Sequence, residues 1–505
     1  MSDFNFTFSE KNNADAIHEA KQPRYPEPIS SKVLMDIFDG CSDFQYRNIS
    51  PGLISNDNLF ICWLDGLCDG SAISKEVIKP LTAVIRCGTS PEPQRLMEGV
   101  VYSSTAMLRD ETDKVIDDIT HGCCAVIFNN VAQAVCFELR SSKQRSISEP
   151  TLEKSIKGAK DSFVELLRTN TALVRQRLCN PSLKLKSSVV GRKTKTRVGI
   201  FYIDGVADPE TVSQLESRLD KIDIDGLLSS SSIEQYIVDN PRSIFPQLIH
   251  TERPDRFARQ LLNGRVGLLV DGLPIGFLLP VNLAEFLRVP QDDAQHAAVS
   301  TALSLVRSLA FVLALSLPAF YVAIAMYHQE MIPTKLLMSI IASKQDVPFS
   351  SALEVLGMLV AFELLQEAGL RMPNPVGDTV SIIGALVVGQ SAVEAKVISP
   401  IAVIVVAFSA ISGLAQPSQD LSAALRLCRF ALVLAAIAAG LFGVTALLCL
   451  IILHLCTIES FGRSYTAPLS SGQKGSMGKT LFRRMAPKDK YRDTELRTPD
   501  RRRQS

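Results

Sequence analysis

The sequence predicts a cytosolic α/β region of two related subdomains, followed by an α-helical membrane domain with about four spans and one partial or re-entrant segment. Two observations predict this fold class. Charged residues are frequent in the first part of the chain, whereas long apolar runs dominate residues 309–458. A pattern of strands and helices also occurs twice in the charged part. A length of 505 residues is too great for one compact domain, which agrees with this division.

Four apolar runs predict the membrane domain. A helix that crosses the hydrocarbon core of a bilayer needs roughly 20 apolar residues. One such run would suit the buried helix of a soluble protein, but four in one block indicate an integral membrane protein. The runs are residues 309–326, 379–393, 397–419 and 430–458.

The charged part contains an internal repeat. FICWLDGLCDGSAISKEVIKPL, from Phe60, resembles GIFYIDGVADPETVSQLESRLDKI, from Gly199. Each is a β-rich run, an Asp-Gly and an amphipathic helix, and we expect Asp208 to cap the second helix with Pro209 at its first position. Val212, Leu215 and Leu219 then line one face of that helix.

Each copy of the repeat also ends in a similar way. We expect a helix, a glycine at its end, a strand, a tight turn and another strand. The glycines are Gly122 and Gly264, and the turns are Asn129-Asn130 and Asp271-Gly272. Two unrelated pieces of this pattern remain the alternative interpretation.

Charge and the repeat define six expected segments. The stretch between the repeats is basic, but Phe163 is its only aromatic residue, so nucleic-acid binding is not favoured. A solvated surface explains it most simply, and contact with anionic lipid or an acidic partner is the functional alternative. The segments are a flexible N-terminal segment (1–44), a first α/β subdomain (45–140), a basic helical connector (141–197), a second α/β subdomain (198–298), the membrane domain (299–460) and a basic cytosolic tail (461–505).

No catalytic or metal-binding constellation stands out. The six histidines are dispersed without ligand spacing, so we expect no enzymatic activity, no metal and no cofactor. The eleven cysteines are scattered without a CxxC pair, and we interpret them as buried, reduced thiols.

Both ends of the chain are expected in the cytosol. The N-terminus, MSDFNFTFSE, has no positive start followed by an apolar core, so it is not a signal peptide. After Gly472 the chain is strongly basic, which favours the cytosolic side. Two cytosolic ends imply an even number of complete spans.

The stretch LEVLGMLVAFELLQEAGL, from Leu353, places three carboxylates among apolar residues. At about 100° per residue, Glu363 and Glu367 share one helix face, whereas Glu354 lies nearly opposite and near a helix end. A carboxylate that faces lipid is costly, so these side chains face protein, water or a cation. Acidic rings around the axis of an oligomer would concentrate cations. A salt bridge, for example with Arg371, or a position outside the bilayer are the alternatives.

Other polar and small residues in the apolar block are weaker candidates. Gln390 and Ser391 would form helix–helix hydrogen bonds or line a pore. Arg426 and Arg429 are expected near the membrane surface, where the last span begins. A stripe of small residues recurs every four positions and would let helices pack closely. It consists of Ala435, Ala439 and Gly443.

Consecutive motifs resemble one known family. They include ISEPTLEKSIKGAKDSFVELLRTNTALVRQRL, KTKTRVGIFYIDGVADP, NPRSIFPQLIHTERPDR, GRVGLLVDGLPIGFLLP and NPVGDTVSIIGALVVGQSAVEAKVISP. In this order, over roughly residues 45–470, the chain is similar to the A subunits of GerA-type spore germinant receptors. KGAKDSF, from Lys157, departs from the Arg-Gly-Pro-Arg-Glu-Gly-Phe run of that family.

The resemblance implies a protein of the inner spore membrane that works with a transporter-like, nutrient-sensing B subunit and a C-type lipoprotein. It also implies a homo-oligomer that forms a cation channel. Three alternatives remain open: an accessory subunit of the spore dipicolinate channel, a non-conducting scaffold, and a stand-alone secondary transporter. The last predicts inverted repeats in the membrane domain, whereas the repeat of this chain lies in its charged part.

Overall fold

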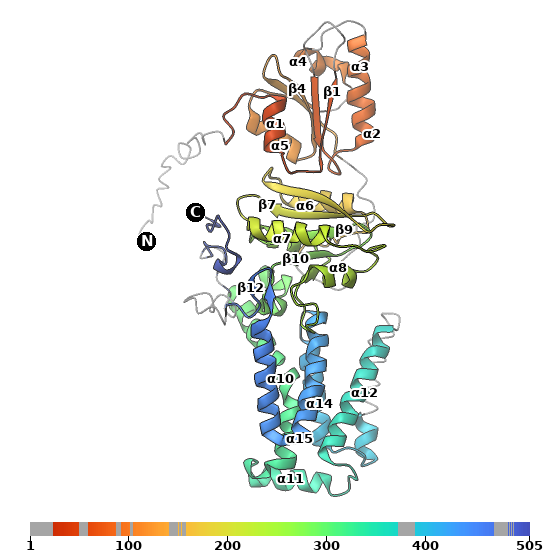
Figure 1. Ribbon diagram of the computed structural model, residues 1–505, viewed down its shortest axis with the longest axis vertical. Helices are drawn as coiled ribbons and strands as arrows, with labels where there is room; N and C mark the ends of the chain where they lie inside the picture. The colour runs from red at the N-terminus through yellow and green to blue at the C-terminus, as the bar shows by residue number, and fades with distance from the viewer. Residues whose placement is uncertain are drawn as a thin grey trace, which may run out of the picture. The chain divides into compact units, whose positions relative to one another are not determined.

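The computed structural model describes residues 24–49, 59–86, 92–101, 105–140, 150, 153, 158–371, 389–468, 483, 485, 487 and 489–504 (Figure 1). Contacts divide the chain into two compact units. The first unit consists of Met1–Arg145 and Leu178–Pro181, and the second consists of Ser146–Arg177 and Ser182–Ser505.

The first unit contains a five-stranded antiparallel sheet of order β1-β2-β4-β5-β3. Its central strand β4, CCAVIF, is buried along its whole length, because helices cover the apolar sheet. Leu59, Ile73 and Val126 belong to its core. The elements are α1 (Ser31–Ile37), β1 (Phe44–Ile49), β2 (Leu59–Leu64), α2 (Gly70–Ala72), η1 (Ile73–Ile78), α3 (Lys79–Arg86), α4 (Pro93–Arg95), η2 (Leu96–Val100), β3 (Ala106–Arg109), α5 (Thr112–Thr120), β4 (Cys123–Phe128) and β5 (Gln133–Glu138).

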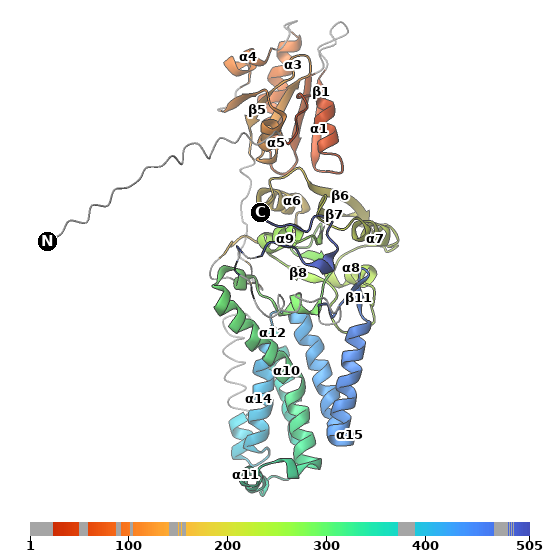
Figure 2. The same cartoon turned by 90° about the vertical axis from the view of Figure 1, so that its left-hand side faces the viewer.

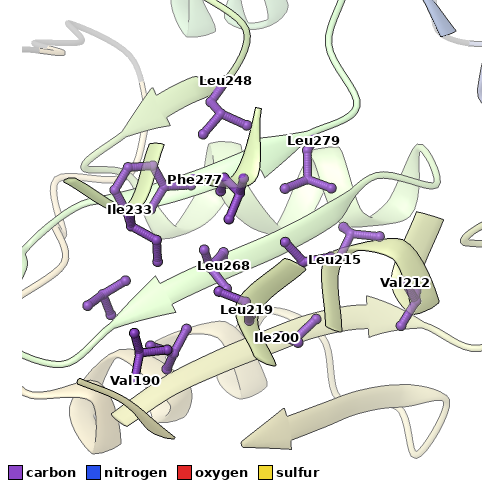
Figure 3. Packing of buried hydrophobic residues seen from close by; sticks show 14 of the residues in the cluster. Val190, Ile200, Val212, Leu215, Leu219, Ile233, Leu248, Leu268, Phe277 and Leu279 are labelled. Carbon is purple, nitrogen blue, oxygen red and sulfur yellow. The ribbon is translucent and has the colours of Figure 1, made fainter. Parts of the chain in front are cut away.

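The second unit begins with a sheet of the same topology, in the order β6-β7-β9-β10-β8. The equal strand order agrees with the repeat in the sequence. Residues of α7, α8 and the sheet form one apolar cluster, in which Leu215, Leu268 and Phe277 are fully buried (Figure 3). The elements are α6 (Leu167–Arg177), β6 (Leu183–Val190), β7 (Thr196–Ile203), α7 (Pro209–Asp220), α8 (Ser230–Ile237), β8 (Ile249–Thr251), α9 (Pro254–Leu262), β9 (Val266–Val270), β10 (Gly276–Leu279), η3 (Leu283–Leu287) and η4 (Pro290–Ala294).

Local signals in the repeat form the expected structures. Asp208 is the N-cap of α7 and Pro209 its first residue. Gly122 and Gly264 follow the ends of α5 and α9 with φ of 92° and 101°, a left-handed conformation that glycine adopts without a steric penalty. Gly272, in the turn between β9 and β10, has a φ of 89°. These predictions are confirmed.

Two predicted segments contain structure that was not expected, and the tail makes a contact that the sequence did not predict. Strand β6 lies inside the stretch expected to be a helical connector, because LKLKSSVV alternates buried and more exposed residues as a strand does. Helix α1, capped by Ser30, lies inside the N-terminal segment expected to be flexible. The last part of the tail folds back onto the second sheet region, where Arg492 Nε donates to the carbonyl oxygen of Leu262 over 2.9 Å.

The rest of the second unit is helical. Two of its helices, α10 and α15, are long and apolar enough to cross a membrane, and α14 is a shorter apolar helix. Most of the predicted apolar run 379–393 lies outside the described residues. The elements are α10 (Ala297–Tyr327), η5 (Gln329–Met331), α11 (Thr334–Lys344), α12 (Ser351–Arg371), α14 (Pro400–Leu414), α15 (Gln419–Thr457), β11 (Glu459–Ser460), β12 (Arg463–Ser464) and η7 (Thr494–Leu496).

Helix α15 reverses direction in its middle. Its 39 residues would extend about 58 Å if straight, yet both of its ends contact the second α/β region. Asp420 hydrogen-bonds to His250, and His454 hydrogen-bonds to Ser243. The backbone is non-helical at Ala439 and Gly440, and the two halves run side by side (Figure 2). The run 430–458, predicted as one span, therefore contains a reversal.

Candidate functional site

The three glutamates of α12 occupy three different environments. α12 contacts α10, α14 and α15. The side chain of Glu354 is fully buried, that of Glu363 is 35% exposed, and Glu367 is exposed. The separation of Glu354 from the other two agrees with the helical spacing in the sequence.

Glu354 joins three helices at the first turn of α12. One carboxylate oxygen accepts hydrogen bonds from the backbone N–H of Ser399 (2.8 Å) and from its hydroxyl (2.6 Å). Ser399 is the N-cap of α14, where the helix dipole stabilises a negative charge. The other oxygen lies 3.2 Å from Nζ of Lys344, the last residue of α11. Glu354 therefore holds α11, α12 and α14 together, a role that needs no ion.

Glu363 forms an ion pair between α12 and α15. Its Oε1 accepts from Nη1 of Arg426 at 2.7 Å, and its Oε2 lies 3.8 Å from Nη2 of Arg429. Arg429, whose side chain is only 4% exposed, also donates to Ser409 Oγ of α14 over 3.4 Å. Gln366, one turn beyond Glu363, accepts from Arg426 at 3.2 Å. One carboxylate thus faces two guanidinium groups.

The remaining polar candidates lie on exposed surface. Gln390 and Ser391 are exposed in the helical turn 389–394, and Gln390 donates to Glu394 over 2.8 Å. In the described part of the chain, no hydrogen bond or ion pair joins their side chains to α12. The side chain of Arg371, a partner considered for Glu367, lies outside the described residues.

The small-residue stripe lies at the reversal of α15. Ala439 and Gly440 depart from helical geometry, so Ala435 and Gly443 are on opposite sides of the turn. A Cβ at Gly443 would lie 2.2 Å from the carbonyl oxygen of Ala435. Gly440 packs beside Tyr327, whose hydroxyl donates to the carbonyl oxygen of Ile437 over 2.5 Å. The stripe therefore brings two parts of the same chain together, at the end of α10.

The sequence identified the acids but not their partners. Arg426 and Arg429 were expected near the membrane surface. Charged residues in an apolar helix pair with one another, so the position of these two arginines could have indicated an acidic partner. Lys344 and Ser399 gave no such signal, because their contacts with Glu354 depend on how three helices pack. Arranged in this way, Glu354 and Glu363 stabilise helix packing, and Glu367 lies on the exposed surface of α12.

Two α/β sheets of the same topology, followed by apolar helices of which two are long enough to cross a membrane, define the class to which this protein belongs. Within this class, the chain belongs to the GerA family of Bacillus/Clostridium spore germination proteins, whose family model matches residues 32–495.

Two relatives illustrate the membership. Spore germination protein KA of Bacillus subtilis (strain 168) is 36% identical over 442 residues, which are 88% of this chain and 81% of that protein. A membrane protein of the same organism, YfkQ, is 35% identical over 450 residues, 89% of this chain and 86% of that one. Among solved structures, the N-terminal domain of the A subunit of the Bacillus megaterium germinant receptor GerK3 covers 51% of this chain and 98% of its own, with 27% identity and a TM-score of 0.40.

Proposed function

We propose that this chain is the A-type membrane subunit of a nutrient-sensing spore germinant receptor, and that several copies form a cation-conducting assembly. Membership of the GerA family supports the receptor role. Two carboxylates of α12 support the proposed cation conduction. Glu363 is partly exposed, Glu367 is exposed, and the two lie one turn apart. Repeated around a symmetry axis, these carboxylates form rings that concentrate cations and repel anions.

The assembly sits in the inner spore membrane, with both termini on the core side. The apolar helices α10 and α15 support insertion in a lipid bilayer. Two relatives from Bacillus subtilis (strain 168) are named spore germination protein B1 and spore germination protein A1. The partners in this proposal are a transporter-like B subunit and a C-type lipoprotein. The B subunit senses the nutrient, and this subunit opens to cations. Gln390 and Ser391 are further candidates for lining the pathway.

A non-conducting scaffold is the second candidate, and one observation favours it. Glu363 already has a cationic partner, Arg426, at 2.7 Å, and Arg429 adds a second positive charge. An acid that is neutralised in this way stabilises the packing of α12 against α15 rather than attracting potassium. The two candidates differ in whether Glu363 and Glu367 affect ion flow.

Potassium release from liposomes that contain the purified full-length protein tests the proposal. We expect wild type to conduct, and Glu367→Gln to lower the preference for potassium over chloride by about tenfold, because a carboxylate ring raises the local cation concentration. Glu363→Gln should lower it further, since it leaves Arg426 and Arg429 without their counter-charge. Glu330→Gln, at an exposed acid of η5, is the matched control.

Oligomeric state, measured on the same samples, separates the candidates. If both α12 variants assemble normally and lose selectivity, the acids line a conduction pathway. If wild type assembles with its B and C partners and still conducts nothing, the scaffold role replaces the channel.

A further inference from the structure

The imidazole of His250 joins the second α/β region to the first turn of α15. His250 is the middle residue of the edge strand β8, and its Nδ1 lies 2.9 Å from Oδ2 of Asp420, the second residue of α15. Its Nε2 is buried and has no hydrogen-bond partner among the described residues. The ring packs edge-on against Phe277 of β10, with 5.1 Å between centroids. A titratable group thus sits where a membrane helix meets the folded region.

Three carboxylates of the described residues act on this ring. Asp420 comes from α15, and Glu234 of α8 has its Oε2 3.7 Å from Nε2 of His250. Glu153, which accepts from Thr251 beside His250, is a more distant carboxylate and is itself paired with Arg256 of α9. A protonated imidazole would donate to Asp420 and face Glu234, whereas a neutral one leaves these carboxylates without a counter-charge.

We propose that His250 is a proton-operated latch, which holds the second α/β region on the first turn of α15 when the ring is protonated and releases it when the proton is lost. Asp420 is the partner on the helix, and Glu234 is the carboxylate that favours the charged ring. The opposite end of α15 contacts the same region through His454 and the hydroxyl of Ser243, so release at Asp420 leaves the helix attached at one end.

The titration of His250 determines the direction of the switch. Burial by itself would lower the pKa of His250, but the hydrogen bond to Asp420 and the charges of Glu234, Asp420 and Glu153 outweigh it, so the pKa lies above 6.5. A group whose pKa is raised on folding stabilises the contact fully below the unfolded pKa. That stabilisation is lost as the pH rises through the folded pKa. The latch is therefore closed in mildly acidic solution and open in alkaline solution.

Hydrogen–deuterium exchange of the full-length protein in lipid nanodiscs tests the latch without any ion flux. The region to follow is the first two turns of α15 and strand β8, from about pH 5.5 to about pH 8.5, across the range in which histidine titrates. After correction for intrinsic exchange chemistry, we expect wild-type exchange to rise several-fold over this range, because the contact loses its stabilisation as the ring loses its proton. His250→Gln should be fast at every pH. His250→Lys, which keeps a positive charge, should be slow at every pH.

Two further variants keep the test decisive. His454→Gln, at the other end of α15, should retain the wild-type pH profile. Asp420→Asn keeps the imidazole but removes its partner, and should flatten the profile even if His250→Gln does not fold. An unchanged profile in His250→Gln or in Asp420→Asn overturns the latch, and so does a flat profile in wild type.

The link from the latch to ion flow rests on the proposed function. In conducting liposomes, potassium flux should change with pH in wild type but not in His250→Lys. Liposomes that conduct nothing would contradict the proposed channel, while the exchange profiles would still decide the latch.

Discussion

The two α/β sheets share one topology but fill their cores differently. Aligning Gly122 with Gly264 places α5 and β4 of the first sheet on α9 and β9 of the second. In the second sheet, the ring of Phe257 lies where a Cβ on Gly267 would be 2.2 Å away, and one on Gly276 2.8 Å away. In the first sheet, Val115 takes the place of Phe257, and Ala125 and Ala134 take the places of the two glycines. A large helix residue thus accompanies glycines on the sheet, and a smaller one accompanies alanines.

The polar content of the two cores also differs. Cys123 of β4 corresponds to Arg265, which donates to the carbonyl oxygen of Pro280 over 2.9 Å and lies 3.5 Å from Glu285. The first core holds buried thiols at Cys62, Cys124 and Cys136. The topology therefore tolerates either a thiol or an ion pair at equivalent depth, provided that each buried polar group is neutral or paired.

The largest expected difference between the two sheets is the stability lost when the helix residue, Phe257 or Val115, is truncated to alanine. Phe257→Ala removes a ring that fills the space above two glycines, so it should destabilise the second sheet by about 4 kcal/mol. Val115→Ala, its counterpart, removes less volume and should cost about 2 kcal/mol in the first sheet. Hydrogen exchange of β9 and β4 in the full-length protein measures both. Equal losses in the two sheets would contradict the idea that they divide core volume differently.

The stability of the two cores should also depend differently on pH, and the second core should be the more sensitive to acid. Burial alone would raise the pKa of Glu285, but the charges of Arg265, Arg288 and Arg256 lower it to about 2. A lowered pKa stabilises the folded state above about pH 4.5, and this contribution, of order 3 kcal/mol, is lost as the pH falls toward 2. We expect local exchange around Glu285 to rise with acid in wild type, and less so in Glu285→Gln.

The buried thiols of the first core predict that this core loses stability in alkali rather than in acid. Burial, together with nearby negative charge, raises the pKa of Cys68 to about 12 and that of Cys123 to about 11. A neutral buried thiol favours folding until the unfolded thiol ionises, so the first sheet should lose stability above about pH 9. If alkali loosens both sheets equally, the thiols do not account for the difference. Cys124→Ala, which removes one thiol, should reduce the alkaline loss in the first sheet.

Much of this comparison is visible in the sequence, because it depends on local signals. The Asp-Gly turns, the helix-ending glycines and the cap at Asp208 are set by backbone conformation near each residue. Those signals gave the repeat and most elements of both sheets. Strand β6 was missed because its basic surroundings masked the alternation in LKLKSSVV. A strand is stabilised by its neighbours in the sheet, which a single stretch does not reveal.

The candidate site was less predictable, for a related reason. The spacing of Glu354, Glu363 and Glu367 fixes which acids share a face, since helical geometry is local. Their partners are distant in sequence, as Arg426 and Ser399 show. The reversal of α15 was hidden because glycine and alanine are common inside membrane helices. The non-helical backbone at Ala439 and Gly440, and the contacts of both helix ends with one folded region, reveal it.

The smallest expected effect concerns the glycines under Phe257. Gly267→Ala would force its methyl group into the ring, an overpacking that should cost about 2 kcal/mol. The reciprocal change, Ala125→Gly, should cost about 1 kcal/mol through backbone entropy alone. Combining Gly267→Ala with Phe257→Val reproduces the pairing of the first sheet, so the double variant should be more stable than the sum of the single losses predicts. If the two losses are strictly additive, the residues at positions 257 and 267 do not compensate for each other's volume. The likeness of the two sheets would then be limited to strand order.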